Sequence, residues 1–195
     1  RDFSQHADTS TAMKIRQVWG SLTSQFAKEN DKFLWGVVKK GARAREYEIA
    51  VQWLVDSGIV RRVERVKLGN KLPMRAYQDS SAFKLYFVDV GLFRRLAQVP
   101  TAVVLEKNAI FNEFNGLIAE QFVLQNIQSK DIFYWTSGAQ SEVDFVIQYE
   151  KDVVPIEVKS GENVKSKSLG VYRGKYNPRL SIRFSMRELL MDDGL

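Results

Sequence analysis

The chain has 195 residues, of which 45% are hydrophobic and 27% charged, a composition that excludes disorder as its main state. It holds 29 Lys and Arg against 23 Asp and Glu, which gives a net charge of +6. Cysteine is absent and His6 is the single histidine, so disulfides, thiolate metal sites and histidine-based triads are excluded.

These absences limit the chemistry to carboxylates, lysines, hydroxyls or a hard metal ion bound by oxygen. No apolar stretch approaches the ~20 residues of a membrane span, and we expect a cytoplasmic protein with no membrane partner. The charge is uneven, because two basic segments, residues 39–75 and 159–187, flank an acidic middle. Basic segments are typical of proteins that bind a polyanion such as nucleic acid, although a solvated basic surface is the other interpretation.

The N-terminal part predicts amphipathic helices. Apolar residues recur at helical spacing between Ile15 and Phe26, which predicts the first helix. Another is expected over residues 43–56, ending before Gly58, a residue type that favours the turn after a helix. The stripe of this helix that we expect to face the core consists of Ile49, Ala50, Trp53 and Leu54.

A basic β-hairpin is expected next. Residues 59–66 favour a strand, residues 69–73 a turn, and residues 75–77 the start of the return strand. Helices followed by a basic hairpin suggest a winged helix, in which the hairpin would contact phosphates. A winged helix used for protein packing is the alternative. The cations available for phosphates are Arg61, Arg62, Arg65, Lys67 and Lys71.

A domain boundary is expected after the next strand. Residues 83–92 predict a strand that ends in a turn, where Asp89 would be a turn or cap residue. We therefore assign residues 1–90 to a winged-helix-like domain and residues 91–195 to a second domain.

The second domain begins with a predicted helix over residues 112–128. In helical projection Glu120 falls within an apolar stripe, and a carboxylate there is costly to bury without a partner. The alternative is a charge at the rim of the stripe that reaches water.

Three strands follow, at residues 132–136, 142–149 and 153–159. A two-residue turn at Glu150–Lys151 would join the last two strands as a hairpin. Alternating apolar residues then select the register that pairs Phe145 with Ile156, or one shifted by two residues.

That register places Asp144 opposite Glu157 and Glu142 opposite Lys159. Two facing carboxylates repel, so a proton, a lysine or a bound cation must offset their charge. Mg²⁺ or Mn²⁺ would suit Asp144 and Glu157, with Glu120 completing the metal shell. Lys159 would orient the nucleophile or neutralise developing negative charge in phosphodiester hydrolysis.

The arrangement of Glu120, Asp144 and then Glu157-Val158-Lys159 resembles the restriction-endonuclease-like, or PD-(D/E)XK, nuclease superfamily. Further runs resemble the C-terminal region of a large family of prokaryotic AAA-type ATPases. They include residues 83–92, Asn115–Glu120, Tyr134–Thr136, Glu142–Phe145 and Pro155–Gly161.

The resemblance covers roughly residues 13–195 and implies a winged-helix-like segment followed by a restriction-endonuclease-like mixed sheet flanked by helices. It also implies that an ATPase domain precedes these parts in the full-length protein. The phosphate-binding signature Gly-x-x-x-x-Gly-Lys-[Ser/Thr] does not occur here, so no ATP site is expected in this chain. Family members usually continue into another strand, so we expect the C-terminal end to be truncated.

Three functional hypotheses follow. The first is a Mg²⁺-dependent nuclease domain acting on DNA, with Asp144, Glu157 and Lys159 as catalytic residues. The second is a non-catalytic module with a nuclease-like fold that binds nucleic acid or protein for its ATPase, and the third is a purely structural hairpin. For Tyr172 and Tyr176, spaced by four, helical core packing is favoured over base stacking. The basic residues that could follow a phosphate backbone in this domain are Lys165, Lys167, Arg173 and Lys175.

Overall fold

The computed structural model describes residues 8–26, 32–100, 112–138, 141–161, 166–188 and 191. The fold is mixed α/β, as predicted. Two compact units make up the chain: residues 1–65 with 79–114, and residues 66–78 with 115–195. Among the described helices, none is long and apolar enough to cross a membrane.

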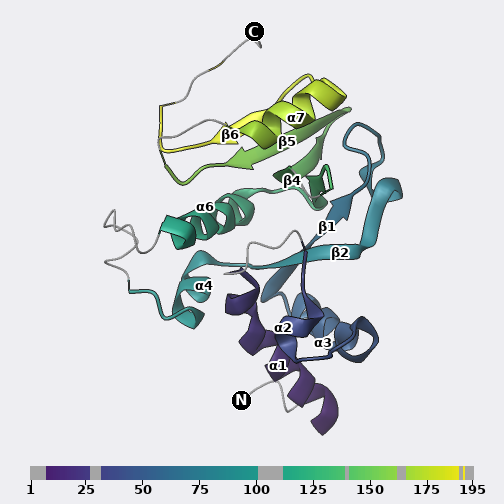
Figure 1. The fold of residues 1–195 in the computed structure, drawn as a ribbon, viewed down its shortest axis with the longest axis vertical. Coiled ribbons are helices and arrows are strands. Elements are labelled where there is room, and N and C mark those ends of the chain that lie inside the picture. Colours follow the sequence, from purple (N-terminus) through teal and green to yellow (C-terminus); the bar gives the residue numbers. More distant parts are fainter. Residues whose placement is uncertain are drawn as a thin grey trace. The chain divides into compact units, whose positions relative to one another are not determined.

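The first unit begins with helices (Figure 1), and the sequence predicts the first and the last of them but not the short one between. Helix α1 buries Ile15, Val18 and Leu22, and it packs against both following helices. The predicted helical periodicity of this segment is therefore confirmed. The three helices are α1 (Thr9–Phe26), α2 (Trp35–Val38) and α3 (Ala44–Asp56).

The predicted core stripe of α3 is wrong in part. Ile49 is 72% exposed, whereas Tyr47, Val51 and Leu54 are buried. Positions 47, 51 and 54 follow the helical period, and Ile49 lies about 200° from Tyr47 around the axis. The helix ends as predicted before Gly58, which adopts a positive φ of 70°.

The helices lead into β1 (Val60–Val66) and β2 (Gln78–Phe87), which are neighbours in a sheet. The predicted start of the return strand at residues 75–77 is wrong, because Met74–Tyr77 form a short 3₁₀ helix, η2. Buried Met74 anchors this turn, so the strand begins only at Gln78. The connection between the strands, with Val66 and Gln78, belongs to the second unit.

Helix α4 (Val90–Leu96) follows β2 in the first unit. Asp89 is its cap, as expected, because its carboxylate accepts a hydrogen bond from the Leu92 backbone N–H at 2.9 Å. On the inner face Phe93 stacks on Phe87, with ring centroids 5.6 Å apart. An aromatic core therefore holds α4 on β2.

The second unit contains strands in the order β3-β4-β5-β6, with α6 and α7 flanking them (Figure 1). Pairing is antiparallel from β3 to β5 and parallel between β5 and β6. The sheet is therefore mixed. The elements are α6 (Asn112–Asn126), β3 (Ile132–Thr136), β4 (Glu142–Tyr149), β5 (Asp152–Val158), α7 (Lys167–Tyr176) and β6 (Ile182–Phe184).

The β4–β5 hairpin has the predicted register. Phe145 pairs with Ile156, and the pairing continues to Tyr149 and Asp152. The intervening two-residue turn includes Glu150, whose φ is 53°. Alternation of apolar residues left two registers open, and the two-residue turn at Glu150–Lys151 selects the one that the structure adopts.

Helix α7 packs on the sheet through Tyr172, which is fully buried. The centroid of its ring lies 5.1 Å from that of Trp135, in an edge-on arrangement, and 4.9 Å from that of Tyr176. These contacts confirm core packing for both tyrosines. The Tyr172 hydroxyl donates a hydrogen bond to the Gly69 carbonyl, and Met74 joins the same hydrophobic cluster. The β1–β2 connection is thus part of the core of the second unit.

Gly69 has no room for a side chain. A Cβ at this position would lie 2.6 Å from the Tyr172 ring, which is too buried to move away. We expect Gly69→Ala to destabilise the chain by about 1–3 kcal/mol in urea denaturation. The matched control is Gly170→Ala, because no atom lies within 4 Å of a Cβ added there and helical alanine is favoured over glycine. Equal effects of the two substitutions would contradict this packing.

Candidate functional site

Asp144 lies where β4 departs from regular pairing. Val146 and Val143 of β4 are three residues apart, whereas their partners on β3, Phe133 and Trp135, are two residues apart. The extra residue makes a β-bulge, a feature that re-aims side chains next to functional sites. The predicted Asp144–Glu157 pair lies one step beyond the last β4–β5 pair, and there the Asp144 carboxylate accepts a hydrogen bond from the Val158 backbone N–H at 2.7 Å.

Glu157 and Lys159 form an ion pair at the end of β5. The Lys159 Nζ lies 2.8 Å from the Glu157 Oε1, and the two side chains are 34% and 4% exposed. The other carboxylate oxygen, Glu157 Oε2, is buried, and no hydrogen-bond donor among the described residues reaches it. A buried carboxylate with one unsatisfied oxygen is costly, so this atom is suited to a further positive partner.

The site is electrostatically coupled. Burial raises the pKa of Asp144 well above its ordinary value, and the charges of Glu120 and Glu157 raise it further. The hydrogen bond from Val158 opposes this shift, and Glu142 adds to it. Asp144 therefore holds its proton more strongly than an ordinary aspartate.

The same negative charges disfavour the ionised form of Asp144 and favour the charged form of Lys159. Burial lowers the pKa of its ammonium group, but the hydrogen bond and charge of Glu157 raise it. The charges of Asp144 and Glu120 contribute in the same direction, so the pKa of Lys159 is raised. Lys159 is therefore a firmly charged ammonium group beside a buried carboxylate.

Glu120 is brought into this field by α6, as predicted, and its side chain is half-buried. The next residue, Gln121, is fully buried and was missed by the sequence analysis. The helical spacing of Gln121 with Leu117 and Leu124 is the sequence feature that indicates its burial. Among the residues that the structure describes, no group of three or more carboxylates is arranged to hold a single metal ion.

Of the predicted hairpin cations, Arg61, Arg62 and Arg65 belong to the first unit, whereas Lys67 and Lys71 belong to the second. Arg62 pairs with Glu48 and with Glu64, and its guanidinium lies 3.9 Å from the Phe83 ring centroid. Arg65 pairs with Asp79 at 2.7 Å. These interactions hold both arginines within the fold.

Arg61 is half-buried, and burial lowers the pKa of its guanidinium.

In the second unit, α7 carries Lys167, Arg173 and Lys175, all exposed. The Lys175 Nζ lies 5.5 Å from the Trp135 ring centroid. Lys165 falls outside the described residues. The structure thus brings Glu120, Asp144, Glu157 and Lys159 together, with the α7 cations in the same unit.

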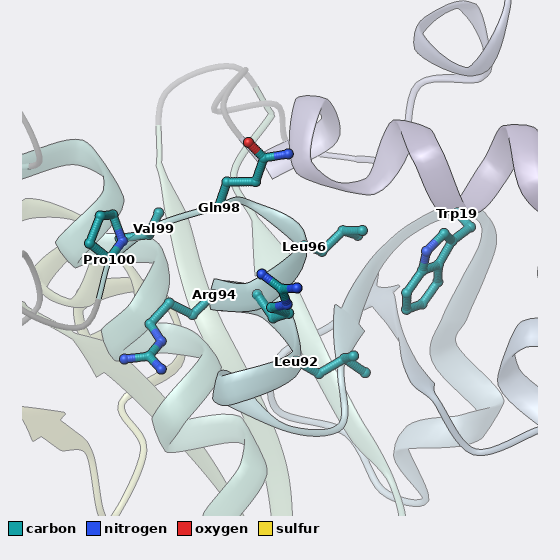
Figure 2. Close-up of a pocket in the computed structure, with 8 residues that line it drawn as sticks. Trp19, Leu92, Arg94, Leu96, Gln98, Val99 and Pro100 are labelled. Atoms are coloured by element: carbon teal, nitrogen blue, oxygen red, sulfur yellow. The ribbon is translucent and has the colours of Figure 1, made fainter.

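A separate pocket of about 730 Å³ lies in the first unit (Figure 2). Trp19 of α1 faces residues of α4 and of the segment after it, and aliphatic side chains make up much of the wall. It contains none of the residues that the sequence assigned to chemistry. The lining residues are Trp19, Leu92, Arg94, Arg95, Leu96, Gln98, Val99 and Pro100.

Comparison with known proteins gives two matches to protein families. Residues 115–193, which hold the carboxylate site, match a family described as "Domain of unknown function (DUF4143)". Residues 1–102 match a family described as "Domain of unknown function (DUF8612)". No curated protein and no solved structure matches the chain. Since the second of these family matches spans more than half of the sequence, the chain belongs to the family of the domain of unknown function DUF8612.

Proposed function

We propose that the second unit is a metal-dependent nuclease domain that hydrolyses phosphodiester bonds in DNA, in the cytoplasm and as part of a larger ATPase. The observation that carries the proposal is the buried Glu157 Oε2, which no described donor satisfies although Lys159 pairs with the other oxygen. Asp144 and Glu120 place further negative charge around it. A bound cation would relieve both the unsatisfied oxygen and the repulsion.

The donor set fits a hard divalent ion. Asp144 and Glu157 supply carboxylate oxygens, which Mg²⁺ prefers, and Glu120 lies within their field. When bound, Mg²⁺ or Mn²⁺ would activate water and stabilise charge on a phosphate. Lys159 would keep Glu157 oriented and present its positive charge to the negative charge that develops during hydrolysis. The Val158 backbone N–H would fix the orientation of Asp144.

DNA as the substrate is supported by the exposed cations of α7, which belong to the same unit as the site. The ATPase context is supported by the match of residues 115–193 to DUF4143, because domains of this type are known from C-terminal regions of AAA-type ATPases. The partner would then be the ATPase domain of the full-length protein.

The second candidate is a non-catalytic module that binds nucleic acid or protein for such an ATPase. One observation favours it: the described carboxylates do not form a group of three that could hold one ion. The experiments below separate the two candidates, since only the nuclease requires both a metal and Lys159.

Replacing Asp144 by Asn is expected to stabilise the metal-free chain at pH 8. Because its pKa is raised in the fold, ionised Asp144 opposes folding above its ordinary pKa, and a neutral amide removes that penalty while still accepting a hydrogen bond. We expect the thermal midpoint in EDTA to rise by a few degrees, since ~1 kcal/mol corresponds to about 2–4 °C in a domain of this size. At pH 3, where Asp144 is protonated in both states, the gain should vanish.

The control for this substitution is Asp152→Asn in the same hairpin, where the carboxylate lies 3.7 Å from Arg179 at the surface. It should not raise the midpoint. A lower midpoint for Asp144→Asn would show that the carboxylate is a stabilising structural group.

Mg²⁺ and Mn²⁺ are expected to bind the wild-type chain, and not Asp144→Asn or Glu157→Gln, in calorimetric titrations. Affinity should increase with pH, because a proton held by Asp144 at a raised pKa must leave before a cation binds. The Asp152→Asn variant should bind as the wild type does. Metal affinity that is independent of pH between 5 and 8 would contradict the assignment of Asp144 as a ligand.

DNA cleavage in Mg²⁺ is expected to fall by roughly 10²-fold or more in Lys159→Gln, since a charged group aimed at developing negative charge contributes on this scale. Glutamine retains an N–H donor for Glu157, so the fold should be maintained, as circular dichroism would show. The control is Lys151→Ala, at the exposed turn of the same hairpin. If the wild type binds DNA but cleaves no single-stranded, double-stranded or branched form, the binding module becomes the conclusion.

A further inference from the structure

Strand β6 runs directly beside the segment that carries the candidate site. Glu157 pairs with Arg183 and Val158 with Phe184, in parallel. The Lys159 backbone N–H then donates to the Phe184 carbonyl at 2.9 Å, so the ladder continues beyond the last pair. The three-residue strand β6 therefore pairs residue by residue with Ile156, Glu157 and Val158.

This register places Arg183 next to Glu157 on one face of the sheet. Paired residues of neighbouring strands direct their side chains to the same side, and the strands lie ~4.8 Å apart. Lys159, two residues after Glu157, shares that face as well. Arg183 is thus one strand away from the buried carboxylate and beside its ion pair.

Arg183 is exposed, and its guanidinium makes no hydrogen bond, ion pair or ring contact with any residue that the structure describes. By contrast, three arginines form ion pairs: Arg62 and Arg65 in the first unit, and Arg75 with Asp131 in the second. Glu157 Oε2 also remains unsatisfied although Arg183 lies on the adjacent strand. The positive charge of Arg183 is therefore not used by the neighbouring carboxylate.

An anionic substrate needs such a charge at this place. Glu120, Asp144 and Glu157 repel a phosphate group, and the ammonium group of Lys159 is already paired. A guanidinium can bind a phosphate through two parallel N–H···O bonds, which a lysine cannot reproduce.

We propose that Arg183 binds a phosphate of the DNA backbone next to the candidate site and so positions the substrate; the proposal rests on the nuclease function proposed above. Arg183 is a substrate-binding residue, distinct from the groups assigned to the reaction itself. It was not singled out by the sequence, because its role follows from the pairing of β5 with β6.

The test compares steady-state cleavage of a fluorescein-labelled DNA in Mg²⁺ by the wild type, Arg183→Ala and Arg183→Lys, each as the full chain. We expect Arg183→Ala to raise KM by roughly tenfold, the effect of one charged hydrogen-bonded contact, and to change kcat by less than about twofold. Arg183→Lys should recover part of the affinity. DNA binding is measured in an Asp144→Asn background, which prevents turnover. There the slope of the logarithm of the binding constant against the logarithm of salt concentration should be smaller by about one when Arg183→Ala is added.

The matched control is Arg187→Ala, an exposed arginine shortly after β6 that pairs with no residue of β5. It should leave KM, kcat and the salt slope unchanged. An unchanged KM and salt slope in Arg183→Ala would overturn the proposal, and so would a lower thermal midpoint accompanied by a loss of kcat alone. Failure of the wild type to cleave DNA would instead count against the nuclease function, and the role of Arg183 would fall with it.

Discussion

The cost of placing carboxylates inside the β4–β5 hairpin is the constraint on which the rest of the second unit depends. Glu157 is almost fully buried, and the Asp144 side chain is turned toward the backbone of β5. An apolar pair at these positions would make a more stable hairpin. The structure offsets only part of the cost, through Lys159 and the Val158 N–H. Such incompletely compensated charge is typical of sites built to bind a charged ligand.

The surrounding structure serves to hold that hairpin rigid. The bulge in β4 sets the position of Asp144, α6 brings Glu120 near, and β6 continues the ladder beyond Glu157. Tyr172 packs α7 against Trp135 and the sheet. A site placed on strands whose neighbours fix them on both sides loses little energy to reorganisation when a ligand binds.

Much of this arrangement could be predicted from the sequence, because local patterns determine it. Alternating apolar residues together with a two-residue turn placed Phe145 opposite Ile156, and the helical period placed Glu120 within the apolar stripe of its helix. The error at Ile49 arose because several apolar residues lie close together in α3, and an apolar run alone does not fix which of them faces inward. The neighbour of Glu157 on β6 was out of reach, since a three-residue parallel strand after a helix carries no register signal of its own.

The hydrogen bond between Tyr172 and Gly69 has a consequence for how this protein can be divided. The hydrophobic cluster of the second unit takes Val66 and Met74 from the β1–β2 connection, far from the strands in the sequence. A piece that begins after residue 90 would leave Trp135 and Tyr172 facing solvent where those two residues now pack. The two family matches, over residues 1–102 and 115–193, therefore divide the chain into sequence segments and do not divide its folding units. The smallest piece able to rebuild the candidate site with its own core must therefore include the β1–β2 connection, residues 66–78.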